Sequence, residues 1–115
     1  MGFNSAWYIE LRGSADHDVW TEAASVDAAA ERVSGWRLEH AGDRRVLHHA
    51  GGTVELVYSA ADKYGNFAQG ASPQRANLVT LICWGRGHEA ACHALASELA
   101  DALRWEVAVD PGATQ

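Results

Sequence analysis

Two cysteines and a histidine lie close together in the second half of the chain, and these residue types could bind a metal ion. Cys83 lies in an apolar segment, and His88 and Cys92 are four residues apart in the helical pattern that follows. Residues at this spacing share one helical face, as paired zinc ligands can. No C-x-x-C or H-x-x-x-H pair is present, and Cys92 belongs to the stripe that buries the helix. We therefore expect two buried, reduced thiols and no cofactor, with a zinc site at these three residues as the alternative.

The segment Gly85-Arg86-Gly87 lies between a predicted strand and a predicted helix, where an anion could bind. Backbone N–H groups at a helix N-terminus attract negative charge, and Arg86 could add a second contact beside Gly87. The segment lacks the G-K-[ST] of a phosphate-binding loop and the third glycine of a dinucleotide-binding motif. We expect the glycines to permit a tight turn, with an anion site at Arg86 and Gly87 as the alternative.

No arrangement of residue types predicts catalysis. A reactive cysteine needs an exposed, electropositive environment, whereas Cys83 lies in the middle of an apolar strand. Loop aspartates such as Asp16 and Asp18 rarely lose the solvent contact that would separate their pKa values for acid–base work. No Ser-His-Asp order with an oxyanion loop is present. We therefore expect a protein that is not an enzyme.

Aromatic and acidic residues in two loops are better suited to binding another protein. Trp20 lies between an acidic segment and Glu22, and a long irregular stretch between Ala60 and Arg75 mixes aromatic with polar side chains. Aromatic anchors rimmed by charge are typical of protein interfaces. The predicted partner-binding residues are Asp16, Asp18, Trp20, Asp62, Tyr64 and Phe67. The alternative is that Trp20 covers the first helix and that Tyr64 and Phe67 pack back onto the sheet.

Composition and charge indicate which class of molecule the chain could bind. The formal net charge is −6 over 115 residues, and the isoelectric point is near 5.4. Nucleic acid is disfavoured because its affinity comes mainly from Lys and Arg that displace counterions, so a basic protein is the expected partner. No segment approaches the length of a membrane span, and the first residues lack the pattern of a secretion signal, so we expect a cytoplasmic protein without membrane contact.

The first half of the chain shows one strand, one helix and a meander. Trp7, Ile9 and Leu11 alternate with polar residues, which predicts a strand with one buried face. Ser25 is the expected N-cap of a helix that Gly35 ends. Its apolar stripe is Val26, Ala29, Ala30 and Val33.

From Trp36 to Ser59 the pattern predicts three strands joined by turns at Gly42-Asp43 and Gly51-Gly52. In this register Leu47 lies opposite Leu38, and Arg45 lies opposite His40. The expected core face of the meander consists of Trp36, Leu38, His40, Leu47, His49, Val54, Leu56 and Tyr58. A shift of one residue would bury the charged row instead.

The second half contributes a buried strand, a long helix and a last strand. The apolar segment from Leu78 to Trp84 predicts a strand buried on both faces, and a helix from about His88 to Leu103 follows. Alternation from Trp105 predicts a final strand. The order β-α-β-β-β-β-α-β predicts an α+β, two-layer sandwich: a mixed, mainly antiparallel six-stranded sheet with two helices on one face, loosely ferredoxin-like. We expect one domain over 1–110 and a short flexible tail at 111–115.

The chain is small and acidic, lacks catalytic motifs, and has the passage from Leu78 to Leu103 followed by Trp105-Glu106-Val107. In these features it resembles the small immunity proteins of bacterial polymorphic-toxin and contact-dependent inhibition systems. The resemblance implies tight, non-catalytic binding that neutralises a cognate toxin, often a basic nuclease. Two alternatives stay open. One is a small ligand- or metal-binding module at the Gly85–Cys92 turn, and the other is a homodimeric or larger accessory domain that pairs an exposed sheet edge.

Overall fold

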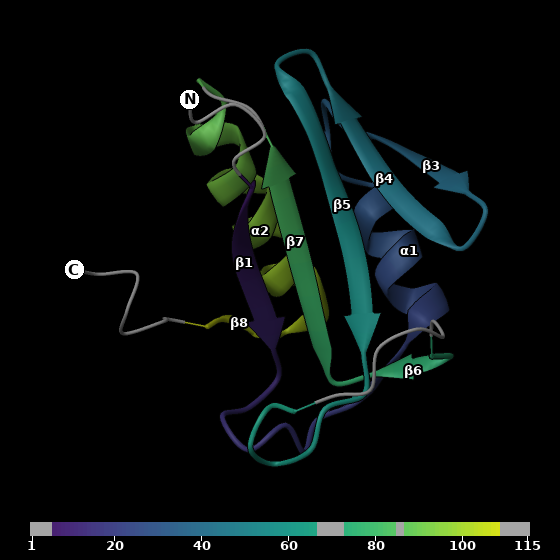
Figure 1. The fold of residues 1–115 in the computed structure, drawn as a ribbon, viewed down its shortest axis with the longest axis vertical. Helices are drawn as coiled ribbons and strands as arrows, with labels where there is room; N and C mark the ends of the chain where they lie inside the picture. The colour runs from purple at the N-terminus through teal and green to yellow at the C-terminus, as the bar shows by residue number, and fades with distance from the viewer. Residues whose placement is uncertain (1–5, 67–72, 85–86, 109–115) are drawn as a thin grey trace.

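The computed structural model describes residues 6–66, 73–84 and 87–108, in which a main sheet is covered on one face by two helices (Figure 1). The elements are β1 (Ala6–Arg12), β2 (Thr21–Glu22), α1 (Ala23–Glu31), β3 (Arg37–Ala41), β4 (Arg44–His49), β5 (Gly52–Ser59), β6 (Arg75–Ala76), β7 (Leu78–Trp84), α2 (Glu89–Leu103) and β8 (Glu106–Val107). The α+β sandwich predicted from the sequence is confirmed.

Six strands form the main sheet in the order β3-β4-β5-β7-β1-β8. Every described pair in it is antiparallel, so the parallel component expected from the sequence is absent from this part of the chain. Without the β3–β4 hairpin, the remaining order is β-α-β-β-α-β with β1 between β7 and β8, which is the ferredoxin-like arrangement. A second sheet consists of β2 and β6 alone.

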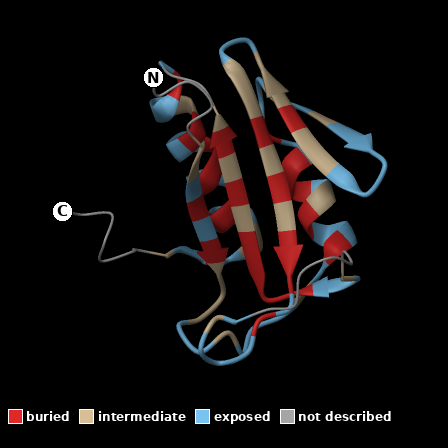
Figure 2. Cartoon of the chain, in the orientation of Figure 1, coloured by how far each residue is buried: buried red, intermediate tan, exposed pale blue. Residues whose placement is uncertain are grey.

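Both helices cover the same face of the sheet, and Figure 1 views the other face, with the helices behind it. Side chains that point to the helices form the core; Leu11, Leu47, Leu81 and Leu99 are fully buried there. Along the strands, buried residues alternate with less buried ones (Figure 2), which is the period of a sheet with one covered face.

This alternation corrects the prediction that β7 is buried on both faces. Val79, Leu81 and Cys83 are buried, whereas Ile82 and Trp84 on the other face are only half-buried. The helices supply one apolar layer, and in the described residues no element covers the opposite face. An antiparallel sheet tolerates this arrangement because one apolar face suffices to bury it.

The meander has the predicted faces but a different second turn. His40 pairs with Arg45 and Leu38 with Leu47, as predicted. His49 pairs with Gly52, so the turn is Ala50-Gly51 and not Gly51-Gly52. This difference moves the pairing by two residues, and a shift of two leaves each side chain on its predicted face.

A close contact explains why a strand residue, Gly52, is a glycine. A Cβ at Gly52 would lie 2.7 Å from Cε1 of His88, whose buried ring packs against the hairpin. No local pattern in the sequence predicts this long-range contact.

Helix α1 begins two residues before the predicted N-cap. Its N-cap is Glu22, without a side-chain cap bond, and Ser25 lies inside the helix. The chain enters the helix early because β2 pairs with β6 and the Ala23 amide donates to the carbonyl of Gln74 at 2.7 Å. The helix ends at Glu31 with Arg32 as its C-cap, four residues before the predicted stop, so Gly35, with φ +87°, belongs to the turn that leads into β3.

Candidate protein-binding surface

Two loops lie together at the end of the sheet where β1 and β5 finish (Figure 1). The first loop, 13–20, joins β1 to β2, and the second follows β5 and is described over 60–66. Five of the six predicted partner-binding residues lie in these loops, and the sixth, Phe67, lies outside the described residues. We call the surface formed by residues 13–20 and 60–66 the two-loop surface.

The buried side chain of Asn77 connects the two loops by hydrogen bonds. Its Nδ2 donates to the carbonyls of His17 and Ala61 at 2.8 and 2.7 Å, and its Oδ1 accepts from the Ala61 amide at 2.7 Å. The side chain is fully buried, so these bonds have no competition from water. Asn77 is not among the residues predicted from the sequence, although an asparagine between Ala76 and the apolar β7 is a recognisable signal of a buried polar contact.

His17 adopts an uncommon backbone conformation at the centre of the first loop. Its φ is +58°, in the left-handed region, where histidine is tolerated better than most residues. The ring lies against Gly65 of the second loop, where a Cβ would be 3.6 Å from Cε1. Its Nδ1 is buried and has no hydrogen-bond partner among the described residues. A strained residue that joins two loops is typical of functional surfaces.

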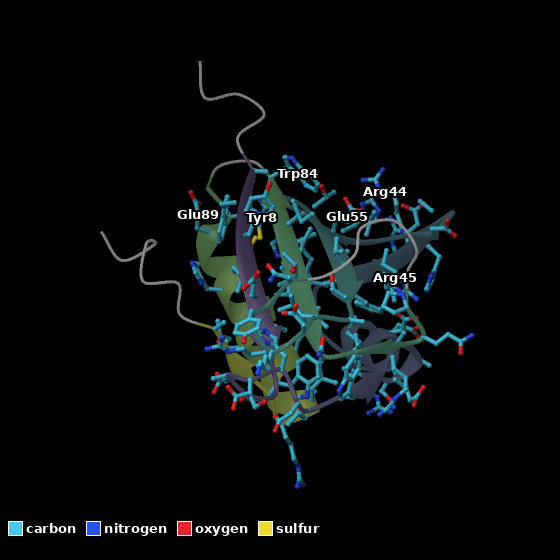
Figure 3. All side chains as sticks on the ribbon, turned by 60° about the horizontal axis from the view of Figure 1, so that its bottom comes forward. Tyr8, Arg44, Arg45, Glu55, Trp84 and Glu89 are labelled. Carbon is cyan, nitrogen blue, oxygen red and sulfur yellow. The ribbon has the colours of Figure 1, made fainter. Side chains whose placement is uncertain are left out.

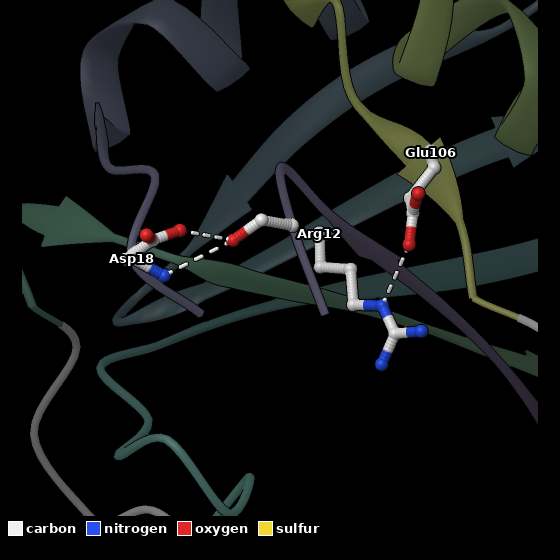
Figure 4. Close-up of polar contacts among 4 residues, drawn as sticks. Arg12, Asp18 and Glu106 are labelled. Carbon is white, nitrogen blue, oxygen red and sulfur yellow. Dashed lines mark hydrogen bonds and ion pairs between the residues drawn. The ribbon is translucent and has the colours of Figure 1, made fainter. Parts of the chain in front are cut away.

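Short polar contacts fix the rest of the first loop. The Ser14 hydroxyl bonds to the carboxylate of Asp18 and accepts the Asp18 amide at 3.2 Å (Figure 4). Gly13 allows Val19 to pack directly on the backbone, because a Cβ there would lie 2.4 Å from the Val19 side chain. Arg12, just before the loop, is paired with Glu106 of β8 at 2.9 Å (Figure 4).

The carboxylate of Asp62 holds the second loop in shape by accepting hydrogen bonds within it, so it is less available to a partner than a free surface carboxylate would be. Its Oδ1 accepts the amides of Tyr64 and Asn66 at 2.8 and 3.0 Å. Gly65, with φ +86°, donates its amide to the Asp62 carbonyl at 2.9 Å. This tight turn leaves the ring of Tyr64 77% exposed.

Trp20 packs against a neighbouring side chain on one side and is exposed to solvent on the other. Its ring lies 5.7 Å from the guanidinium of Arg75, which also pairs with Glu22 at 3.4 Å. The indole remains 40% exposed, as does Val19 beside it in the chain. Part of the ring is thus available to a partner, and the alternative that Trp20 covers the first helix stays open.

The two-loop surface therefore concentrates exposed apolar groups. Among the described residues, the exposed large apolar side chains are Tyr8, Val19, Trp20, Tyr64 and Val107. Three of these five belong to the two-loop surface. Asp16 and Asp18 are also exposed, so aromatic and acidic groups share the surface as predicted.

The thiol and imidazole candidates come together in the core and not at a surface. Cys92 Sγ lies 3.4 Å from Nδ1 of His88, and Nε2 of that ring bonds to the carbonyl of Trp84. Burial raises the pKa of Cys83 to about 12 and raises that of Cys92, so both thiols stay protonated at neutral pH. No group of three His, Cys, Asp or Glu side chains in the described residues could hold a metal ion.

The candidate anion site is occupied by the protein itself. The Gly87 amide donates to Oε1 of Glu89 at 2.9 Å, so a carboxylate already lies at the N-terminus of α2. Such a group compensates the helix dipole and opposes a second anion. Arg86 lies outside the described residues.

The uncovered sheet face is mixed in character. Tyr8 is 63% exposed there, opposite Ile82, towards the end of β1 that lies away from the two-loop surface. Arg44 and Glu55 form a two-pronged pair on the same face at 3.1 and 3.2 Å, and Figure 3 shows them apart from Tyr8 and Trp84. This ion pair places charge on the same face as the exposed ring of Tyr8.

Comparison with protein-family models, with curated proteins and with solved structures gives no match. In the described part of the chain, neither helix combines the length and the apolar character that a membrane span needs.

Proposed function

We propose that the chain is a non-catalytic protein-binding domain that binds a basic protein through the two-loop surface. The observation that carries the proposal is the joint exposure of Trp20 and Tyr64 on loops that one buried side chain, Asn77, holds together. Aromatic side chains of this kind supply most of the binding energy of protein interfaces. A surface fixed in advance also loses less conformational entropy when it binds.

Charge supports the choice of partner. The net charge of −6 attracts a basic protein over long distances, and Asp16 and Asp18 add negative charge beside the aromatic anchors. Together with the resemblance described above, these features favour an immunity protein that binds a cognate bacterial toxin in the cytoplasm and blocks its activity.

The test is co-expression with the open reading frame next to its own gene, scored by rescue of growth and by recovery of a one-to-one complex. Trp20→Ala and Tyr64→Ala should each weaken the complex by about 2 kcal/mol, or roughly thirtyfold in Kd. Tyr8→Ala is the matched control, because it removes another exposed tyrosine, which lies on the sheet face.

Circular dichroism checks that each variant is folded. A harmless neighbour that does not co-purify would contradict the immunity proposal. A complex weakened by Tyr8→Ala and not by Tyr64→Ala would instead move the interface to the sheet.

A further inference from the structure

Strand β3 is an exposed edge of the main sheet. It pairs with β4 on one side, and no described strand pairs with its other side. Four of its five residues are exposed, and only Leu38 is half-buried. The opposite edge, β8, has two residues, so β3 is the longer template for a further strand.

The backbone of β3 determines which residues could pair outward. The turn at Gly42-Asp43 has two residues with Gly42 at φ +64°, and the pair next to such a turn exchanges its backbone hydrogen bonds with the partner strand. Because this pattern alternates, Ala41, Glu39 and Arg37 direct their backbone groups to β4. Leu38 and His40 then direct theirs to the open edge.

Edge strands often avoid self-association by carrying like charges, but β3 carries opposite charges two residues apart. Arg37 and Glu39 lie on the same face of the strand, on either side of Leu38. A strand with this spacing is complementary to an antiparallel copy of itself.

We propose that β3 pairs with β3 of a second copy of this chain, in an antiparallel register centred on Leu38. In this register Leu38 lies opposite Leu38 of the second copy, with outward-directed backbone groups on both sides. Arg37 lies opposite Glu39 of the second copy, and Glu39 opposite its Arg37. The two sheets become one continuous sheet across a two-fold axis.

Charge selects this register over its neighbours. A pairing centred on Glu39 would place two carboxylates opposite each other, and one centred on Arg37 would do the same with two guanidinium groups. Opposite charges at directly facing positions stabilise strand pairs, and like charges destabilise them. The contact between Nε2 of His48 and Oε1 of Glu39 at 2.7 Å holds that carboxylate on the face where Arg37 of the second copy would meet it.

The dimer is independent of the proposed function. Strand β3 and the two-loop surface lie at different ends of the molecule in Figure 1, so a dimer would leave both two-loop surfaces accessible.

The experiment measures the mass of the full chain in solution by sedimentation over a wide range of protein concentration. The wild type should approach twice its 12.4 kDa as the concentration rises. Glu39→Arg and Arg37→Glu, tested singly, each create two like-charge pairs and should remain monomeric. An equimolar mixture of the two variants restores both opposite-charge pairs and should form a heterodimer.

Matched controls separate this register from a general effect of charge. Glu98→Arg on the exposed side of α2 and Arg32→Glu at the exposed C-cap of α1 make the same charge changes outside β3 and should leave the dimer unchanged. A wild type that stays monomeric at every concentration would overturn the proposal. It would be overturned equally by variants that dimerise like the wild type, or by a mixture of folded variants that stays monomeric.

Discussion

The side chain of Asn77 and the backbone of Ala61 exchange two hydrogen bonds, each 2.7 Å long. The amide group of Asn77 thus pairs with Ala61 as a neighbouring strand would, and its second N–H reaches the carbonyl of His17. Because one side chain saturates backbone groups from both loops, the shape of the two-loop surface depends on it.

Replacement of Asn77 by Ala should lower the free energy of unfolding by about 2 to 3 kcal/mol, because it leaves buried backbone groups of Ala61 and His17 unpaired. Urea unfolding measures the loss, and hydrogen exchange should show a less protected Ala61 amide. Asn77→Asp is the sharper comparison: its charged form would face two carbonyls, so it should destabilise more at pH 7 than at pH 4. A loss below about 0.5 kcal/mol for Asn77→Ala would contradict this role.

Gly13→Ala should destabilise the fold by about 1 to 3 kcal/mol, since the new methyl group would lie 2.4 Å from the Val19 side chain. The double variant with Val19→Gly removes the clash and should recover part of the loss in thermal unfolding. Gly35→Ala serves as control: its φ of +87° is strained for alanine, but no atom lies within 4 Å, so Val19→Gly should not rescue it. Equal rescue of both would show that steric contact with Val19 is not the cause.

Tyr58→Phe should lower the free energy of unfolding by about 1 to 2 kcal/mol. The reason is that the buried Tyr58 hydroxyl donates to Oδ1 of Asp27, the same oxygen that Arg45 binds at 2.7 Å. Burial, and then the bond to Asp27, raise the pKa of Tyr58 above its ordinary value. The stabilising contribution is therefore complete below pH about 10 and is lost as the pH rises further. Chemical unfolding as a function of pH should show a smaller alkaline loss in Tyr58→Phe. Tyr64→Phe, on an exposed ring, should leave stability unchanged at every pH.

The two buried thiols should react with a disulfide reagent only when the protein unfolds, since both side chains are fully buried. Burial and the neighbouring Cys92 raise the pKa of Cys83 to about 12. The unfolded thiol ionises near pH 8.5, so this part of the stability is complete below that value and is lost as the pH rises towards 12. Cys83→Ala should reduce that alkaline loss. Rapid modification of the native protein at neutral pH would contradict the buried position.

Periodicity predicted the parts of the fold in which one residue type repeats on one face. Leu47, Val54 and Leu56 point to the helices as expected, since a shift of one residue in the register would bury charge. The predicted start of α1 was wrong because the chain before it is fixed by the pairing of β2 with β6. This ladder has only two residue pairs, which is too short to produce a periodic pattern in the sequence. The second meander turn was predicted one residue too late because the contact with His88, far along the chain, requires a glycine at position 52 although that residue is not part of the turn.

The candidate surface was predictable in its residue types but not in its assembly. Trp20 and Tyr64 were identified because aromatic side chains without periodic partners stood in polar loops. The assembly of their two loops depends on Asn77, which is separated from His17 by sixty positions in the chain, and a pattern within a short window cannot detect such a contact. The role of Asp62 changed for a similar reason, because the amides that it accepts follow from the local turn.

The position of β1 between β7 and β8 has a consequence for synthesis of the protein. On the ribosome, β1 leaves first, but both of its strand partners are made in the last third of the chain. Strands β3, β4 and β5 can pair with their neighbours as they appear, whereas Ile9 and Leu11 remain without a partner strand until β7 arrives. We therefore expect β1 to be the last central strand to join the sheet, and chains that stop before β7 to expose it and aggregate.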